Sequence, residues 1–182
     1  MTSDKSFFFN YPLVTINYPL KRKMMSVDIP ITGAVRFLRD RKVDFLPRIY
    51  KYVEKGGTRE SAKQLGVDEH AVIKTLVFET NEKKPLIVLM HGDREVSTKN
   101  LARHLGVKSV EPATADSATK VTGYQFGGTS PFGTRMNLSV YVESTIFKLD
   151  RILINGGKRG FLVEIDPSVL RLIGAKEVEV GI

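Results

Sequence analysis

The chain has 182 residues, 42% of them hydrophobic, which is enough to bury one substantial core but small for two domains. It contains no cysteine, which excludes a disulfide scaffold, a thiolate metal site and a cysteine nucleophile. The formal net charge of +8 favours a polyanionic partner such as nucleic acid. Residues 1–42 carry eight Lys and Arg against three Asp and Glu, so over half of that charge lies at the N-terminal end.

Residues 1–30 show neither helical nor strand periodicity, because prolines recur at positions 12, 19 and 30. Polar residues interrupt their apolar run, and the basic cluster follows that run instead of preceding it as in a secretory signal. No segment approaches the ~20 apolar residues of a membrane span. We therefore expect a flexible leader, or a true start at Met24 or Met25, ahead of one cytoplasmic domain formed by residues 31–182.

Regular patterns begin at Thr32, a plausible N-cap. Helical periodicity predicts helices over residues 32–42, 60–65, 98–105 and 117–122, and Pro167 is placed to open a final helix. Apolar and β-branched runs predict strands over residues 48–53, 73–79, 86–90, 138–142, 151–155, 161–165 and 177–180. Strands interleaved with short helices indicate an α+β fold, a compact single domain around a mixed sheet.

A lysine lies at the head of an otherwise apolar strand. Alternation along the strand either points Lys74 to solvent or, at the strand end, aims its ammonium into a cleft. Farther along, residues 122–133 hold four glycines and a proline. Such a backbone can approach a ligand closely and present N–H groups to it, and a purely structural turn is the alternative.

A third unusual segment, residues 155–160, joins two predicted strands with three glycines and two cations. It lacks the strand–loop–helix context of a nucleotide-cofactor site, so we expect no cofactor. Its Lys158 and Arg159, together with Arg39 on the first helix, are candidates for contacts with RNA phosphates. The alternative for each is an ordinary solvated surface position.

The histidines do not form a metal-binding motif. His70, His91 and His104 are widely separated in the sequence, so we expect no metal site. His104 is expected on a helix surface. The chain also has no G-x-S-x-G elbow, which disfavours a serine hydrolase.

In this order and spacing, the segments around Lys74, residues 122–133 and residues 156–160 resemble the YbaK/EbsC family. That family is related to the editing insertion domain of bacterial prolyl-tRNA synthetases, and the resemblance covers about residues 31–180. It implies a compact α+β domain around a mixed, curved sheet with short surrounding helices. The implied activity is trans-editing, the hydrolysis of the ester that joins a wrong amino acid to tRNA, and the resemblance is strongest to the Cys-tRNA(Pro) deacylases.

The resemblance also implies site residues. Lys74 matches the functional lysine of the family, and residues 127–131 match its G-x-x-x-P loop. Tyr50 matches a pocket tyrosine of the deacylase branch, and Glu143 stands where that branch usually has an aspartate. The expected catalytic set is Lys74, Gly127, Gly128 and Thr129, and the expected substrate-binding set is Tyr50, Ser130, Pro131 and Glu143.

An aminoacyl ester is already activated, so the site needs mainly to orient it and stabilise the developing oxyanion. The amides of residues 127–129 are expected to hold the ester carbonyl or the attacking group, and Lys74 to supply positive potential. If the substrate side chain is cysteine, its own thiol can attack the ester, with water as the alternative nucleophile.

Two other functions remain open at this point. The same scaffold could clear Ala-, Ser- or Thr-tRNA, because pocket size separates such side chains by only ~1–3 kcal/mol. The chain could also be a catalytically silent module that binds an aminoacyl-tRNA or a synthetase. A general nucleic-acid-binding domain is disfavoured, since basic and aromatic residues are not interleaved as in an RNP motif. The expected partners are the acceptor end of tRNA(Pro) and, less directly, prolyl-tRNA synthetase.

Overall fold

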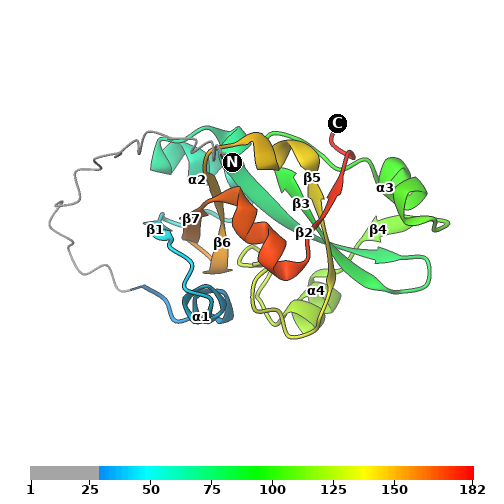
Figure 1. Ribbon diagram of the computed structural model, residues 1–182, viewed down its shortest axis with the longest axis horizontal. Helices are drawn as coiled ribbons and strands as arrows, with labels where there is room; N and C mark the ends of the chain where they lie inside the picture. Colours follow the sequence, from blue (N-terminus) through cyan, green and yellow to red (C-terminus); the bar gives the residue numbers. More distant parts are fainter. Residues whose placement is uncertain (1–28) are drawn as a thin grey trace, which may run out of the picture.

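The computed structural model describes residues 29–182, so the expected leader at residues 1–30 lies almost wholly outside it. The described chain forms one mixed sheet with short helices around it (Figure 1). The strands are β1 (Leu46–Ile49), β2 (Val72–Thr80), β3 (Pro85–His91), β4 (Val110–Pro112), β5 (Ser139–Glu143), β6 (Ile152–Lys158), β7 (Phe161–Ile165) and β8 (Lys176–Val178). The helices are α1 (Gly33–Asp40), α2 (Gly57–Leu65), α3 (Thr98–Leu105) and α4 (Ala115–Thr122), with 3-10 helices η1 (Glu69–Ala71), η2 (Ser144–Lys148) and η3 (Pro167–Ile173).

The strand order is β1-β7-β6-β2-β3-β5-β8, and β4 pairs with β2 off this path. The hairpins β2–β3 and β6–β7 are antiparallel, whereas β2 and β6 are parallel, as are β3 and β5. The prediction of an α+β domain with a mixed sheet is therefore confirmed. Strand β2 lies at the centre of this sheet, between β6 and β3.

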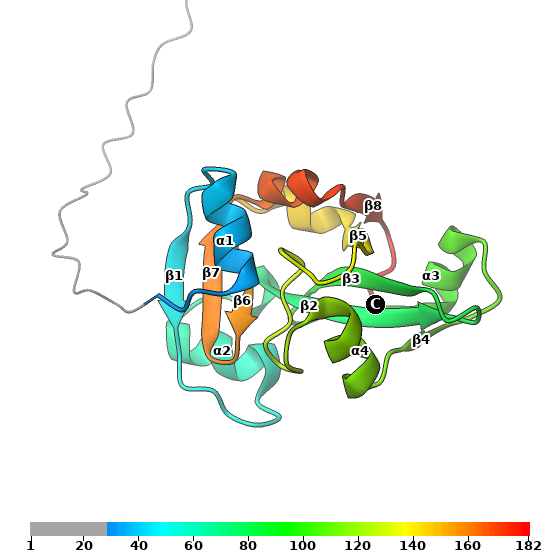
Figure 2. The same cartoon turned by 90° about the horizontal axis from the view of Figure 1, so that it is seen from below.

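Local signals explain where the helices begin and end. The Thr32 hydroxyl accepts the Val35 amide at 3.1 Å, so it caps α1 as expected, and it donates to the Gly156 carbonyl of β6 at 2.5 Å. Helices α2 and α3 end at Gly66 and Gly106, both in the left-handed conformation that favours glycine. Figure 2 shows α1 in front of β6 and β7, while α3 lies at the opposite end of the sheet beside β4.

The two faces of β2 contact different clusters. Ile73 packs into the main core with α1, α4 and the buried residues of β6 and β7. Val72 belongs to a small cluster under α2, and Phe78 to another under α3. Because side chains alternate along a strand, Lys74 shares the face of Val72 and Phe78 and lies between these two clusters. The side chain at position 74 is therefore only partly buried and is not enclosed by either apolar cluster.

Three predictions of secondary structure need correction. The strand expected over residues 48–53 occupies Leu46–Ile49, because its partner β7 ends the ladder at Phe161. The final helix is a 3-10 helix, and the last strand is Lys176–Val178. Sequence patterns missed β4 and η2, since a three-residue strand and a single short turn are too brief to show a period.

Gly156 is predicted to be essential for packing in β6. A Cβ added there would lie 2.4 Å from Cε1 of Phe161, whose side chain is 1% exposed and cannot move away. Gly156→Ala should lower the free energy of unfolding by about 1–3 kcal/mol in urea titrations. Thr119→Ala, on the exposed face of α4, should change it by less than about 0.5 kcal/mol. Equal small changes in both variants would show that the ring adjusts freely.

Candidate active site

Lys74 turns its ammonium back onto the protein instead of extending it into solvent. The ammonium donates a hydrogen bond to the backbone carbonyl of Arg94, in the turn that follows β3. Partial burial lowers the Lys74 pKa from its ordinary value, and the nearby carboxylates of Glu95, Glu69 and Asp93 oppose that shift. The structure therefore shows a partly buried lysine held beside a turn, and its service in a cleft stays a prediction.

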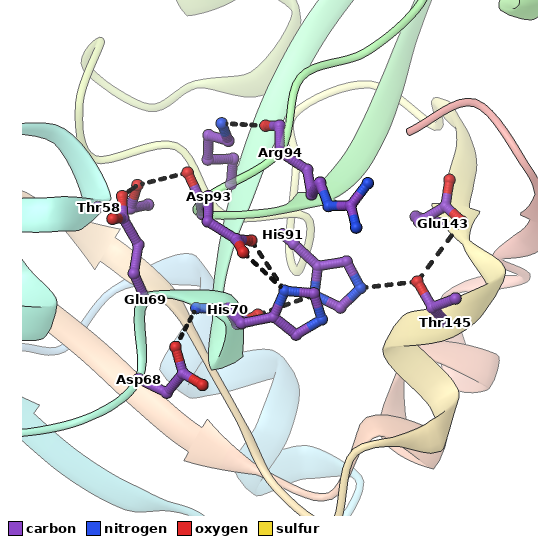
Figure 3. A network of polar contacts seen from close by, with 11 residues as sticks. Thr58, Asp68, Glu69, His70, His91, Asp93, Arg94, Glu143 and Thr145 are labelled. Atoms are coloured by element: carbon purple, nitrogen blue, oxygen red, sulfur yellow. Dashed lines mark hydrogen bonds and ion pairs between the residues drawn. The ribbon is translucent and has the colours of Figure 1, made fainter. Parts of the chain in front are cut away.

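The turn that holds Lys74 is fixed by contacts with η1 and α2. The Thr58 hydroxyl lies 2.9 Å from Oε1 of Glu69 and 3.1 Å from the Gly92 carbonyl, so one residue of α2 reaches both segments (Figure 3). A Cβ on Gly92 would lie 2.5 Å from the Glu69 carbonyl, so only glycine allows this close approach. The Arg94 carbonyl is therefore presented by a rigid turn.

Two histidines that are distant in sequence meet behind this turn. The rings of His70 and His91 stack with centroids 3.7 Å apart, and His70 Nδ1 lies 2.8 Å from Oδ1 of Asp93 (Figure 3). Burial alone would raise the pKa of Asp93, but its hydrogen bond and charge interaction with His70 lower it overall. No spacing motif in the sequence indicates this cluster, because the β2–β3 register and η1 bring the histidines together only in the fold.

His91 is buried, and both of its ring nitrogens have partners. Its Nδ1 lies 2.8 Å from the His70 carbonyl, which can only accept, so Nδ1 carries a proton. Its Nε2 lies 2.8 Å from the Thr145 hydroxyl, which also lies 3.5 Å from Oε1 of Glu143. Burial lowers the pKa of His91, and the charge of His70 adds to this, while the His70 carbonyl, Asp93 and Glu143 oppose it. The ring therefore links β3 to η2.

Glu143 lies beyond Thr145 at the end of β5. It is 7% exposed, and its Oε2 accepts the amides of Val180 at 2.9 Å and Gly181 at 2.8 Å. In this structure the carboxylate thus holds the C-terminal segment through these two hydrogen bonds, whereas the resemblance implied contact with substrate.

The glycine-rich loop is braced by short-range hydrogen bonds. The Gly128 amide donates to the Gln125 carbonyl at 2.8 Å, and Gly127 has a φ of +81°. Ser130 is fully buried, and its hydroxyl accepts the Phe132 amide at 3.3 Å. In the part of the chain that the structure describes, the amides of Gly127 and Thr129 are not used in such bonds.

Asn155 holds this loop from the strand next to the one that carries Lys74. Its side-chain amide donates to the Gly127 carbonyl at 3.3 Å. The parallel ladder between β2 and β6 ends where Ile73 pairs with Ile154, so Lys74 and Asn155 each come one residue after the last pair. Because side chains alternate along both strands, these two side chains leave the same face of the sheet. The lysine and the residue that holds the glycine-rich loop therefore lie on one face of the sheet, on neighbouring strands.

Two tyrosines follow β1, and they occupy different places. Tyr50 packs at the edge of the cluster under α2, and burial raises its pKa. Tyr52, which was not among the residues predicted from the sequence, comes closer to the loop. Its hydroxyl lies 3.1 Å from the point where a Cβ on Gly127 would stand, and its ring is 4.9 Å from the Arg159 guanidinium.

The remaining candidates lie at the periphery. Arg39 and Lys158 are exposed, on α1 and at the end of β6, and Pro131 is buried in the loop.

A cavity of about 340 Å³ between η2 and η3, lined by Phe147, Asp166 and other residues, shares no residue with the Lys74 cluster. Within residues 29–182, three or more metal-ligating side chains do not gather anywhere. No helix in the same range has the length and apolar character needed to cross a membrane.

Comparisons with known proteins agree with this architecture. A family model described as the aminoacyl-tRNA editing domain matches residues 55–172. The Enterococcus faecalis protein EbsC, a candidate Cys-tRNA(Pro)/Cys-tRNA(Cys) deacylase by its name, is 30% identical over 151 residues, which are 82% of this chain and 92% of EbsC. The chain belongs to the aminoacyl-tRNA editing family, a family of aminoacyl-tRNA deacylases, and the predicted YbaK/EbsC resemblance is confirmed.

Two further relatives are a much longer ligase and a solved structure that is matched over almost its whole length. The proline–tRNA ligase of Ligilactobacillus salivarius is 33% identical over 102 residues, which are 56% of this chain but only 18% of the ligase. A crystal structure described as a candidate trans-editing enzyme for prolyl tRNA synthetase has a TM-score of 0.70, with 21% identity over 81% of this chain and 96% of that one. The latter likeness supports the fold.

His91 should make the stability of the domain depend on pH. Because its pKa is lowered in the fold, the unfolded chain takes up the proton first, so this contribution is full above the ordinary pKa of about 6.5 and is lost as pH falls below it. The slope from one group cannot exceed about 1.4 kcal/mol per pH unit. Urea titrations between pH 7.5 and 5.5 should show a smaller slope for His91→Asn than for the wild type.

Asparagine at position 91 keeps a donor for the His70 carbonyl but cannot titrate, so the comparison concerns slopes and not absolute stabilities. His104→Asn is the matched control, because His104 is exposed on α3. An unchanged slope in His91→Asn would show that other groups carry the acid sensitivity.

Proposed function

We propose that this chain hydrolyses mischarged aminoacyl-tRNA in trans, with Cys-tRNA(Pro) as its main substrate. The observation that supports the proposal is that Lys74 and Asn155, which holds the Gly127 loop, leave the same face of the sheet on neighbouring strands. The similarity to EbsC over 92% of its length supports the choice of substrate.

The loop supplies the oxyanion donors in this proposal. The amides of Gly127 and Thr129 are available for the ester carbonyl, whereas the Gly128 amide already holds the loop turn through Gln125. Backbone donors fixed before the reaction stabilise developing negative charge without reorganisation. Gly128 then acts by shaping the loop, and the buried Ser130 and Pro131 act in the same way from beneath it.

Lys74 supplies positive potential from the other side. Its ammonium donates to the Arg94 carbonyl, and the carboxylates of Glu95, Glu69 and Asp93 oppose the lowering of its pKa by partial burial. Such a cation can anchor the terminal ribose or phosphate near the scissile ester. Tyr50 lines the side of this region next to α2.

The substrate can bring its own nucleophile. In Cys-tRNA the side-chain sulfur attacks the ester carbonyl carbon, the C–O bond to the ribose breaks, and the thiol proton passes to the departing ribose oxygen. The products are uncharged tRNA and a cysteine thiolactone, which water opens. For a substrate without a thiol, water attacks the same carbon. Neither route needs a nucleophile from the protein, which agrees with the absence of cysteine.

The wider contacts follow from the substrate. Lys158, Arg159 and Arg39 are proposed to approach the phosphates of the acceptor end, and binding should weaken with salt because few phosphates are neutralised. The relation to the ligase insertion supports a complex with prolyl-tRNA synthetase. A tRNA substrate places the reaction in the cytoplasm.

Replacing Lys74 tests the catalytic assignment. Lys74→Ala should reduce the single-turnover rate of Cys-tRNA(Pro) deacylation roughly tenfold or more, the scale of a lost electrostatic interaction with the transition state. Lys176→Ala, a lysine on β8 away from the cluster, should keep the wild-type rate. A wild-type rate in Lys74→Ala would remove the lysine from the mechanism.

A panel of charged tRNA tests the substrate. We expect deacylation of Cys-tRNA(Pro) to exceed that of tRNA(Pro) charged with Ala, Ser or Pro, measured as release of labelled amino acid. Faster turnover of the Ala or Ser ester would assign a related deacylase, with water as the attacker. Binding without turnover of any member would support the silent module.

A further inference from the structure

One aromatic side chain stands out on the surface. Phe126 is 62% exposed, and the other Phe and Tyr rings of residues 29–182 are buried or partly buried. It belongs to the glycine-rich loop and directly precedes Gly127. An exposed ring of this size forgoes the burial that stabilises aromatic residues elsewhere in the fold, so it is available to a ligand.

The backbone under this ring is held on three sides. The Phe126 carbonyl accepts a hydrogen bond from Arg159 Nε at 2.8 Å, and the Gly127 carbonyl accepts one from Asn155 at 3.3 Å. The Gly128 amide closes the turn onto Gln125 at 2.8 Å. The ring is therefore presented by a rigid turn, which lowers the entropy lost when something stacks on it.

Arg159 and a second aromatic ring lie against the backbone of the segment that carries Phe126. The Arg159 guanidinium lies 4.9 Å from the centre of the Tyr52 ring, and the Tyr52 hydroxyl approaches Gly127. Lys158 is exposed next to Arg159. An exposed ring beside an arginine is the combination that binds single-stranded nucleic acid, in which bases stack on the ring and cations meet the phosphates.

We propose that Phe126 is a stacking site for the base of the tRNA nucleotide that carries the ester, with Arg159 contacting its phosphate. This inference rests on the proposed function, because the amide of the next residue, Gly127, is the donor assigned to the ester carbonyl. A ribose esterified at that point carries its base toward Phe126. The ring would then hold the 3′ end equally before and during the reaction and select one that is unpaired.

Steady-state kinetics distinguish this role from a structural one. Phe126→Ala should raise KM for the aminoacyl-tRNA about 5- to 150-fold and leave kcat within about twofold, because the stacking energy is present both before and during the reaction. Phe126→Leu keeps apolar bulk but loses the flat ring and should behave like Phe126→Ala. Phe126→Tyr should restore the wild-type KM. A wild-type KM in Phe126→Ala, or full function in Phe126→Leu, would overturn the proposal.

A binding measurement separates this site from the catalytic proposal. The chain has no tryptophan, so Phe126→Trp places a single tryptophan at the site. An uncharged RNA hairpin copying the acceptor end should quench its emission, and the same hairpin with an abasic terminal nucleotide should quench it at least fivefold less. Leu172→Trp, on an exposed position of η3, should not respond to either RNA.

The two proposals fail separately in these experiments. Quenching that depends on the terminal base, together with no deacylation by the wild type, would keep the stacking site and remove the enzyme assignment. Active deacylation with equal quenching by intact and abasic hairpins would keep the enzyme and remove the stacking site.

Discussion

The short parallel contact between β2 and β6 is the constraint on which the site depends. The two strands pair only at Val72 with Leu153 and Ile73 with Ile154, after which no further ladder joins them. Just past the last pair, Lys74 and Asn155 leave the same face of the sheet. Lys74 reaches the turn after β3, and Asn155 reaches the glycine-rich loop.

A polar network that runs from an exposed carboxylate to the buried His91 then fixes one side of this region. It runs from Asp93 through His70 and His91 to Thr145, with every short contact at 2.8 Å between groups of compatible donor and acceptor character. Such a network costs little when all members are satisfied and much when one is removed, so it defines a single geometry for the turn. The Arg94 carbonyl that accepts the Lys74 hydrogen bond belongs to the same turn, so the network also fixes its position, although no histidine contacts the ammonium.

Local features of this fold could be predicted from the sequence because their causes are local. The Thr32 cap and the helix ends at residues 65 and 105 depend on a few neighbouring residues and appear where expected. The stacking of His70 on His91 depends on strand register and on η1, which no spacing of single residues reveals. For the same reason Tyr52 was missed: its nearness to Gly127 arises from a loop that meets β1 only in the folded chain.

The distribution of charge separates affinity from chemistry. Around Lys74 three carboxylates oppose the desolvation of one ammonium, so the local charge balance at the proposed reaction centre is not strongly positive. Long-range attraction of a polyanion must therefore come from elsewhere, and Lys158 and Arg159 on the β6–β7 hairpin are placed to provide it next to the loop. In the proposed function, the exposed cations therefore serve the binding of the RNA end, and the partly buried Lys74 serves the ester.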